Sequence, residues 1–374
     1  MEKITPILIT GSKGFLAKNL IPRLIGLGFS NLLLVDRETP KSTYESYVKQ
    51  AKFIFHFAGV NRPEDPKEFM VGNADTITTL LSFLEKYQSK APVVVSSSTQ
   101  ASNNNPYGLS KKAAEDLILS FASKHKHLVF IYRFTNIFGK WARPNYNSVV
   151  ATFCHNISRD LPIKINDEDA KISLIYIDDV VDEMLRCIEG KVTTIDGILR
   201  VFPEYEITVG QLATILQRFK SSRTSLNLEN QQDSLIKKLY ATYLSYLQPD
   251  AFVYDLKMNI DQRGSFTEIF KTSQVGQVSV NISKPGITKG NHYHHTKNEK
   301  FIVVSGIGLI KFRLVNTKEV IEYRVSGDKL QVIDIPPGYV HNITNIGKDD
   351  LVTIMWASEL FDKQNPDTYP MEVE

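Results

Sequence analysis

The sequence predicts two domains of different fold class: a doubly wound parallel α/β sheet over residues 1–247 and an all-β barrel over residues 248–374. Short apolar runs that alternate with helical stretches predict the first, because strand, crossover helix and strand is the pattern of a parallel sheet. Short alternating runs between turn signals predict the second. The boundary is expected near residue 248, where one pattern replaces the other.

Size and composition allow both domains and exclude several classes of protein. The chain has 374 residues, of which 42% are hydrophobic and 23% are charged. The net charge of +3 gives no reason to expect nucleic-acid or membrane-surface binding, although it suits a small phosphate-bearing ligand. Two cysteines are too few for a disulfide framework, and no apolar run approaches the roughly 18 residues of a spanning helix. We therefore expect a cytoplasmic protein with no membrane insertion, in which Cys154 and Cys187 are buried thiols.

The α/β pattern begins with a buried strand over residues 7–10 and a helix over residues 19–27. It ends with a polar surface loop over residues 223–234 and a final helix over residues 235–247. Further strands, with helical stretches between them, are expected over residues 32–35, 53–57, 93–96 and 129–132.

A glycine turn separates the first strand from the first helix. Its sequence is Thr10-Gly11-Ser12-Lys13-Gly14-Phe15-Leu16-Ala17, and its glycines let backbone N–H groups approach a pyrophosphate at the helix N-terminus. A further strand that ends in Asp36-Arg37 supports dinucleotide binding. Asp36 suits the ribose 2′-OH of NAD, whereas Arg37 suits the 2′-phosphate of NADP, so these two residues conflict. The expected contacts in this region are Gly11, Lys13, Gly14, Phe15, Leu16, Asp36 and Arg37.

A tyrosine and a lysine follow a strand that ends in hydroxyl groups. Tyr107 and Lys111 are four residues apart, so on a helix they share one face and the ammonium can lower the phenol pKa from about 10 towards neutrality. Tyr107 would then donate a proton while Ser98 holds a substrate carbonyl and hydride arrives from the nicotinamide. A chance Tyr and Lys on an amphipathic helix is the alternative, and the glycine turn upstream favours the catalytic interpretation.

Six motifs, including the glycine turn and the Tyr-Lys pair, are those of a family in its order and spacing. Through them residues 1–245 resemble the extended short-chain dehydrogenase/reductases that act on nucleotide sugars. The resemblance implies catalysis by Ser98, Tyr107 and Lys111, with Ala58, Gly59 and Lys111 as further cofactor contacts. It also implies that residues 133–147 and the Asp178-Asp179 pair line or support the sugar-nucleotide pocket, although the two aspartates can equally cap a helix that begins at Val180. The motifs are Thr10-Gly11-x2-Gly14-Phe15, His56-Phe57-Ala58-Gly59-Val60, Ser96-Ser97-Ser98, Tyr107-x3-Lys111, Arg133-Phe134-x-Asn136-x2-Gly139 and Tyr176-Ile177-Asp178-Asp179-Val180.

The last third of the chain contains two half-motifs with metal-ligand spacing. The first is Gly286-x5-His292-x-His294-x4-Glu299-x6-Gly306, and the second is Pro336-x-Gly338-x2-His341-x3-Asn345. Three imidazoles and one carboxylate form the ligand set of a mononuclear transition-metal site, so we expect zinc on His292, His294, Glu299 and His341. On a strand His292 and His294 point the same way, whereas Glu299 has the opposite parity. The turn over residues 296–298 must therefore redirect the chain if all four are ligands.

These half-motifs resemble those of cupins. Together with Asp261-x-Arg263-Gly264-Ser265-Phe266-x-Glu268 they resemble the dTDP-4-keto-6-deoxysugar epimerases, whose histidine base stands at the place of His292. This chain departs from those enzymes by adding His294, Glu299 and His341, so the base stays open among Tyr293, His294 and His295. Leu330 also stands where a glycine usually opens the second half-motif.

The order of the two domains resembles bifunctional capsular-polysaccharide enzymes that fuse the reductase to a metal-binding cupin. That resemblance implies a UDP-linked 2-acetamido-2,6-dideoxy-4-hexulose that is inverted at C3 by the cupin and reduced at C4 with NADPH. The product would be UDP-2-acetamido-2,6-dideoxy-L-talose, on the route to UDP-N-acetyl-L-fucosamine for capsule or O-antigen. The chemistry fits, because inversion next to a ketone passes through an enolate that a divalent ion can stabilise.

Two other functions stay open at this stage. The chain could be a single-activity reductase with a non-catalytic, zinc-stabilised cupin, or the cupin could be an iron oxygenase, since the same ligands suit Fe(II). A homodimer is also expected, because cupin sheets often pair at their edges.

Overall fold

The computed structural model describes residues 1–195, 198–364 and 366–374. By its internal contacts the chain divides into two units, each described separately below. The first consists of Met1–Leu216 and Lys238–Gln248, and the second of Gln217–Lys237 and Pro249–Glu374. The last changeover, between Gln248 and Pro249, lies beside the boundary expected from the sequence, but residues 217–237 join the second unit. The expected fold classes are confirmed, since a parallel α/β sheet forms the first unit and antiparallel strands form the second.

A five-stranded parallel sheet lies at the centre of the first unit. The central strand β1 (Ile7–Thr10) pairs with β3 (Phe53–His56) on one side. On its other side β1 pairs with β2 (Leu32–Val35), so the strand order reverses between β1 and β3. In such sheets ligands bind beyond the carboxyl ends of the strands at the point of reversal. The sheet is completed beyond β3 by β4 (Val93–Ser98) and β5 (Val129–Phe134).

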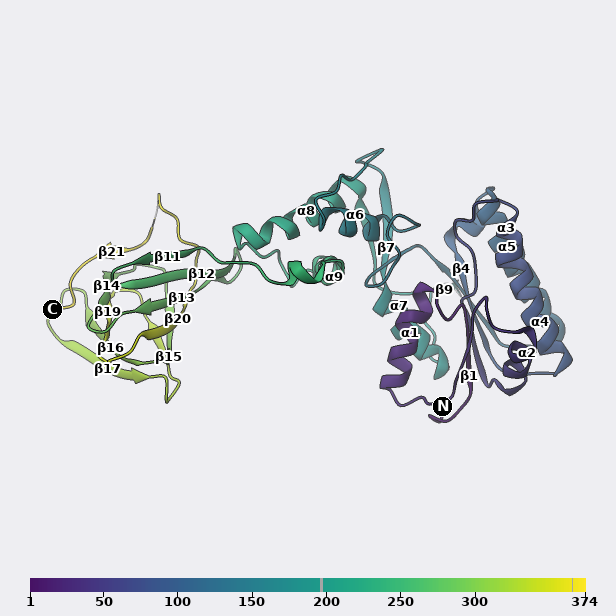
Figure 1. Ribbon diagram of the computed structural model, residues 1–374, viewed down its shortest axis with the longest axis horizontal. Coiled ribbons are helices and arrows are strands. Elements are labelled where there is room, and N and C mark those ends of the chain that lie inside the picture. The colour runs from purple at the N-terminus through teal and green to yellow at the C-terminus, as the bar shows by residue number, and fades with distance from the viewer. Residues whose placement is uncertain (196–197, 365) are drawn as a thin grey trace. The chain divides into compact units, whose positions relative to one another are not determined.

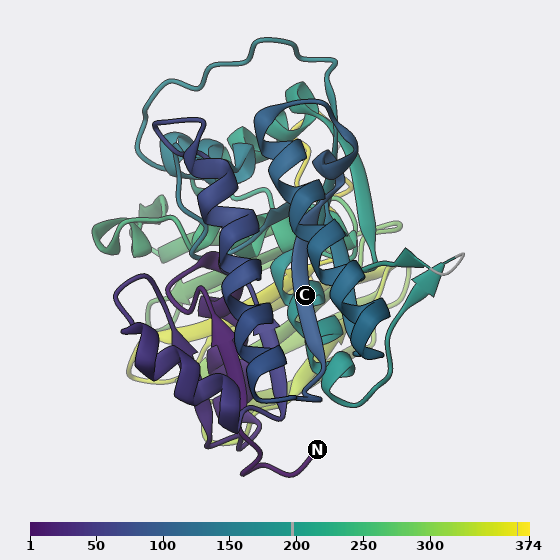
Figure 2. The same ribbon diagram turned by 90° about the vertical axis from the view of Figure 1, so that its right-hand side faces the viewer.

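Helices cover both faces of this sheet (Figure 1). On one face α1 (Phe15–Gly26) and α7 (Ile177–Ile188) pack against the strands. On the other face lie α2 (Lys41–Gln50), α4 (Thr76–Lys86) and α5 (Pro106–His125). Helices α4 and α5 run side by side (Figure 2). Burial on both faces explains why these strands are continuous apolar runs in the sequence.

Helix α1 begins earlier than expected, at Phe15 rather than Asn19. Gly14 is its N-cap residue and donates its N–H to the carbonyl of Gly11 at 2.8 Å. The glycine turn therefore runs directly into the helix, which places the positive end of the helix at the turn.

The remaining elements of the first unit are short, apart from two helices. Helix α8 (Val209–Ser225), which crosses between the units, occupies the start of the expected loop over residues 223–234. Helix α9 (Ser234–Leu244) ends before the expected residue 247. The others are α3 (Glu68–Met70), η1 (Val71–Asp75), η2 (Thr99–Ser102), β6 (Asn136–Phe138), α6 (Val149–Ile157), β7 (Lys171–Tyr176), β8 (Thr194–Ile195), β9 (Ile198–Leu199) and β10 (Glu204–Thr208).

The second unit contains two antiparallel sheets that share one core. Buried side chains from both sheets, among them Phe301, Ile310 and Ile343, form that core. One sheet has the order β11 (Met258–Asp261), β12 (Gly264–Thr272), β13 (Gly276–Ser283), β20 (Leu351–Ala357), β15 (Glu299–Ser305) and β18 (Val332–Ile335). The other has the order β17 (Val320–Ser326), β16 (Ile307–Leu314), β19 (Tyr339–Asn345), β14 (Thr288–Tyr293) and β21 (Tyr369–Pro370).

Two expectations about burial and membranes can be compared with the structure. Cys154 and Cys187 are free and buried, as expected. Within the described ranges, none of the helices combines the length and apolar character needed to cross a bilayer.

Candidate functional site

The glycine turn lies against the segment that follows β3. Gly11 has a φ of 67°, and a Cβ at this position would lie 2.8 Å from backbone atoms of Phe57 and Ala58. The N–H of Ala58 also donates to Thr10 Oγ1 at 3.2 Å. Only glycine combines this backbone conformation with such close approach. The turn is therefore built into the reversal point of the sheet, where a dinucleotide pyrophosphate binds in this fold class.

A cleft of about 810 Å³ opens beside the turn. Most of the expected cofactor contacts line it, whereas Gly11 and Ala58 form the backbone contact described above. Residues of the 134–148 segment, including Arg143 and Tyr146, line it as well, in keeping with the expected sugar-nucleotide side. The expected contacts that line the cleft are Lys13, Gly14, Phe15, Leu16, Gly59 and Lys111.

Asp36 and Arg37 directly follow β2. Lys13 Nζ lies 2.8 Å from Asp36 Oδ2, and this contact lowers the pKa of the Asp36 carboxyl below its usual range. The backbone N–H of Glu38 donates to the other oxygen of Asp36 at 2.8 Å. Arg37 is exposed. The carboxylate that suits NAD is thus already paired with a lysine of the glycine turn.

Ser98, Tyr107 and Lys111 all line the same cleft. The Tyr107 hydroxyl donates to Asn61 Oδ1 at 3.1 Å and is hydrogen-bonded with Ser98. Lys111 Nζ donates to the carbonyl of Ser96 at 3.2 Å and lies 5.9 Å from the centroid of the Tyr107 ring. The strand end of β4 and the first turns of α5 therefore bring the three predicted catalytic side chains together.

The pKa shifts of Tyr107 and Lys111 differ from the expectation. Burial raises the pKa of Tyr107, and the hydrogen bond with Ser98 opposes that rise, so the predicted lowering by Lys111 is not seen. Burial also lowers the pKa of Lys111 to about 8, against an opposing effect of Glu115. The physical reason is that the ammonium is itself buried, and its charge is penalised there.

Neighbours of the catalytic groups went unrecognised in the sequence. Asn61 contacts the Tyr107 hydroxyl from the loop after β3. Glu115, which is 2% exposed, accepts from Arg133 Nη2 at 2.6 Å and from Ser97 Oγ at 2.5 Å. Glu115 lies one helical turn after Lys111, and that i+4 spacing was the one available signal.

The alternative in which Asp178 and Asp179 cap a helix that begins at Val180 is wrong. Helix α7 begins at Ile177 with Tyr176 as its N-cap residue, so Asp178 and Asp179 lie in its first turn. Asp178 Oδ1 pairs with Lys140 at 2.8 Å, and Asp179 pairs with Lys238 at 2.7 Å. The first pair ties α7 to the segment that leads into the cleft wall.

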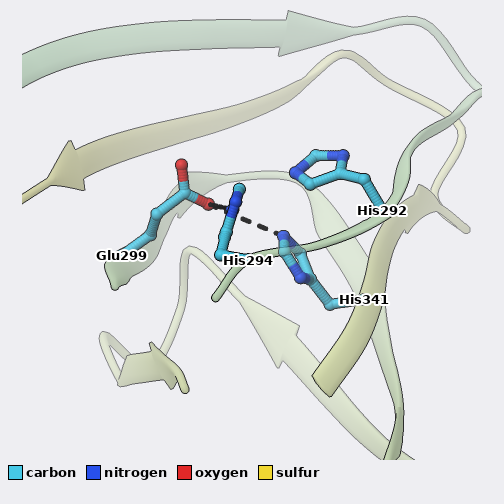
Figure 3. Close-up of side chains that lie close together, drawn as sticks. All are labelled: His292, His294, Glu299 and His341. Atoms are coloured by element: carbon cyan, nitrogen blue, oxygen red, sulfur yellow. Dashed lines mark ion pairs between the residues drawn. The ribbon is translucent and has the colours of Figure 1, made fainter. Parts of the chain in front are cut away.

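The second site lies in the β unit, where the four predicted ligands converge (Figure 3). His292 lies near the end of β14, His294 follows that strand, Glu299 opens β15 and His341 lies on β19. One ligand atom from each lies within 4.8 Å of the others. His294 Nε2 is 3.4 Å and His341 Nε2 is 3.6 Å from Glu299 Oε2. Ligands bound at 2.0–2.1 Å in a tetrahedron are roughly 3.4 Å apart, so these spacings fit a zinc-sized ion.

The polar atoms at this point of convergence are buried. His294 Nε2, His341 Nε2 and Glu299 Oε2 have no hydrogen-bond partner within the described part of the chain. Orphaned buried polar atoms are rare in proteins, and a bound ion is one explanation for them. Burial raises the pKa of Glu299, but the adjacent imidazoles of His294 and His341 outweigh this and lower it to about 2. Burial, reinforced by the other two histidines, lowers the pKa of His292 to about 4. The residues present therefore fit a divalent metal, with an anionic carboxylate and a neutral imidazole at neutral pH.

The opposite ring nitrogens orient two of the histidines. His294 Nδ1 lies 2.6 Å from the backbone carbonyl of Asp367, and His341 Nδ1 lies 3.3 Å from that of Tyr339. A carbonyl at Nδ1 holds the proton there and leaves Nε2 as the metal-ligating atom.

A cavity of about 280 Å³ adjoins the cluster, lined by His292, His341 and Lys289 among others. Lys289 donates to Asn281 Oδ1 at 2.8 Å, and burial lowers its pKa. His295, predicted as a base, is exposed and packs against Tyr369, outside the lining of this cavity. Because His295 does not line this cavity, its role as the base stays a prediction. His294, another of the three candidate bases, is 1% exposed and faces Glu299.

Comparison with known proteins relates the whole chain to one group. Residues 7–197 match the NAD dependent epimerase/dehydratase family, and residues 259–369 match the polysaccharide biosynthesis C-terminal domain. The chain is 44% identical to the UDP-2-acetamido-2,6-beta-L-arabino-hexul-4-ose reductase of Pseudomonas aeruginosa over 98% of each chain.

Two solved structures are similar over the same length. The capsular polysaccharide assembling protein CapF of Staphylococcus aureus has 51% identity and a TM-score of 0.93, covering 98% of this chain and all of that one. CapF with the inhibitor 3-isopropenyl-tropolone has 46% identity and a TM-score of 0.89 over the same shares. The chain therefore belongs to the NAD dependent epimerase/dehydratase family and, within it, to the full-length relatives of CapF that carry a polysaccharide biosynthesis C-terminal domain.

Proposed function

We propose that the chain is a bifunctional UDP-sugar enzyme, in which the β unit inverts C3 of a UDP-2-acetamido-2,6-dideoxy-4-hexulose and the α/β unit reduces the C4 ketone. The product is then UDP-2-acetamido-2,6-dideoxy-L-talose. The observation that carries the proposal is the convergence of three buried ligand atoms, none with a hydrogen bond among the described residues, in the β unit of a chain that also brings Ser98, Tyr107 and Lys111 together. The 44% identical relative, itself called a 4-hexulose reductase, supports the reductive half.

The reductive step uses the groups that line the cleft of the α/β unit. The glycine turn would hold NADPH, which when bound would supply the hydride for C4. Tyr107, whose raised pKa keeps it protonated at neutral pH, donates its hydroxyl proton to the ketone oxygen. Ser98 holds that oxygen, and the Lys111 ammonium stabilises the phenolate left behind. Hydride and proton together convert the ketone to the alcohol, so the step is balanced.

The inversion uses the cavity of the β unit. His292, His294, Glu299 and His341 would hold zinc, which would stabilise the negative charge on O4 as a Lewis acid. The C3 proton passes to a base, for which Tyr293, His294 and His295 are the candidates, and C3 regains a proton on the opposite face. Lys289 adds a fixed cation to the cavity beside His292, where it can hold an anionic oxygen of the substrate. The tropolone inhibitor of the related CapF supports a metal, because its adjacent hydroxyl and ketone oxygens form a bidentate metal ligand.

A nicotinamide cofactor follows from the family, and we propose that it is NADPH. The support is that Lys13 already engages Asp36, while the exposed Arg37 is available for a 2′-phosphate. Arg37→Ala should raise KM for NADPH at least ten-fold and leave KM for NADH nearly unchanged. Lys41→Ala, at the start of α2, is the control. Equal effects on both cofactors would contradict this preference.

The whole proposal can be tested by offering the protein a UDP-2-acetamido-2,6-dideoxy-4-hexulose with and without NADPH and following the products by NMR. The C3-inverted ketone should appear without NADPH, and the 6-deoxytalose product should require it. A single-activity reductase with a non-catalytic zinc-stabilised module is the second candidate, favoured by the relative's name. It would give reduction with NADPH and no change at C3 without it.

We also propose a homodimer and a cytoplasmic location. Strand β11 ends its sheet, and Met258 and Ile260 on it are 51% and 71% exposed, so this edge offers unpaired backbone and apolar side chains to a second copy. Ile260→Lys should convert dimer to monomer in light scattering, whereas an unchanged mass would exclude this edge. The two free, buried cysteines support a reducing compartment.

A further inference from the structure

The turn between β14 and β15 must reorient the chain so that side chains of opposite strand parity face the same point. His292 and His294 have one strand parity and Glu299 the other, yet Figure 3 shows their side chains aimed at one point. The chain must therefore turn over residues 295–298 in one fixed way. A turn of this kind is not held by strand pairing, because β14 ends at Tyr293 and β15 begins at Glu299.

One carboxylate from the C-terminal tail holds the turn. Asp367 Oδ1 accepts the backbone N–H of His295 at 2.9 Å. Its Oδ2 accepts the N–H of Thr296 at 2.9 Å and that of Lys297 at 2.8 Å. The Thr296 hydroxyl donates to the same oxygen at 2.9 Å. Three successive N–H groups that converge on one anion form a nest, and such charge-assisted bonds are strong.

The main chain of Asp367 acts on the cluster directly. Its carbonyl lies 2.6 Å from His294 Nδ1, so it fixes the tautomer that leaves His294 Nε2 facing Glu299. Asp367 has a φ of 25°, an uncommon conformation that aspartate tolerates better than most residues. Side chain and carbonyl of one residue therefore set both the path of the turn and the orientation of one ligand.

The rest of the tail keeps Asp367 in place. Strand β21 pairs with β14, with Pro370 opposite His292 and Tyr369 opposite Tyr293. Lys297, which is 6% exposed, donates from Nζ to Thr368 Oγ1 at 2.8 Å. Further along, Arg313 Nε donates to the carbonyl of the fully buried Val373 at 2.7 Å.

We propose that Asp367 is a positioning residue of the metal centre, which pre-organises the turn and the His294 ring so that His294 and Glu299 meet at the ion. The inference rests on the proposed zinc site. Asp367 itself does not reach the ion, because both of its carboxylate oxygens are occupied by the turn. Groups that orient metal ligands in this way typically contribute 10–100-fold to metal affinity.

The test is zinc affinity measured on the full chain by competition with a chromogenic chelator. Asp367→Asn keeps the size of the side chain but removes its negative charge and replaces one of the two acceptor oxygens with an NH2 donor, which then opposes at least the N–H of His295. Zinc should therefore bind 10–100-fold more weakly and dissociate faster. The control is Asp362→Asn in the same tail, whose carboxylate accepts only the N–H of Gln364 among the described residues and which should keep wild-type affinity.

Two further readouts separate positioning from general stability. The rise in Tm on adding zinc should shrink in Asp367→Asn, because it depends on the dissociation constant, whereas a purely structural role would lower Tm equally with and without zinc. Cobalt substituted into Asp367→Asn should show an altered visible spectrum, which reports ligand geometry. If Asp367→Asn does not fold, Thr296→Val removes only the hydroxyl donor and should weaken zinc binding less, in the same direction.

Two results separate the proposed metal centre from the role of Asp367. Wild-type protein that takes up no zinc would overturn the proposed metal centre and this inference with it. Wild-type protein that binds zinc, with Asp367→Asn matching it in affinity and in cobalt spectrum, would overturn the role of Asp367 alone.

Discussion

His292 on β14 lies directly opposite His341 on β19 in the antiparallel pairing of these strands. Their ring centroids are 4.5 Å apart. The register of two strands is therefore enough to bring together candidate ligands from the two half-motifs, and the other two, His294 and Glu299, flank the turn after β14. The proposed metal centre thus depends on pairing that is already part of the fold.

Loss of one paired histidine should sharply reduce the amount of metal that the protein retains. His341→Ala leaves three of the four ligands, so zinc content measured by mass spectrometry of the metal should fall to about a tenth or less of wild type. His295→Ala is the matched control, because His295 is exposed and lies outside the cluster. If His295→Ala keeps its zinc but loses proton exchange at C3, the prediction that His295 is the base is confirmed.

Replacement of the buried Lys111 should stabilise the folded protein and abolish its reductase activity. Burial lowers the pKa of Lys111 from 10.5 to about 8, which corresponds to a penalty of about 3 kcal/mol on the folded state at neutral pH. Lys111→Met should therefore raise the free energy of unfolding at pH 7 by roughly 2–3 kcal/mol and abolish ketone reduction. Denaturant unfolding measures the first and NADPH oxidation the second. Lys112→Met, on the exposed neighbour, is the control, and a destabilised Lys111→Met would contradict the burial argument.

The pH dependence of that stability difference has a defined sign. Lys111 releases its proton at about pH 8 when folded and at 10.5 when unfolded, so the unfolded state binds more protons between these values. The contribution of Lys111 to stability therefore rises with pH across this window, and the advantage of Lys111→Met should shrink from pH 8 to 10.5. Above pH 8 the wild type should lose kcat/KM for NADPH as the ammonium disappears. A constant stability difference over this range would show that the pKa is not lowered.

A single methyl group at the glycine turn should block the cofactor. In Gly11→Ala the new Cβ would lie 2.8 Å from backbone atoms of Phe57 and Ala58, and its φ of 67° is unfavourable for alanine. We expect at least a ten-fold loss in NADPH affinity, measured by fluorescence titration, and a lower Tm. Gly28→Ala shares the positive φ but meets no atom within 4 Å, so it should lose stability without losing affinity. Equal affinity losses in both variants would show that strain, not contact, sets the effect.

Much of this architecture could be predicted because it follows from local sequence patterns. Strands buried on both faces appear as apolar runs, and β1 and β2 lie where the runs are. The start of α1 was missed because its first turn, from Phe15, belongs to the glycine motif and shows no helical periodicity of its own. The convergence of the four candidate metal ligands could be predicted because three of them lie in one short motif.

Other parts of the site depend on tertiary contacts that no local pattern reveals. Asp367 contacts the turn over residues 295–298 because β21 pairs with β14. No sequence motif in the tail predicts this contact. Lys289 and His292 are three residues apart and would face opposite ways on a regular strand. An irregularity at Asn291, with a φ of 62°, lets both line the same cavity.

If two independent sites act in turn on one sugar, each should work without the other, and deuterium incorporation at C3 in D2O without NADPH measures the first step alone. Tyr107→Phe should exchange C3 at the wild-type rate and fail to oxidise NADPH. Glu299→Gln should fail to exchange C3 and still reduce a ketone supplied in the inverted form. Loss of exchange in Tyr107→Phe, or full exchange in Glu299→Gln, would contradict the account.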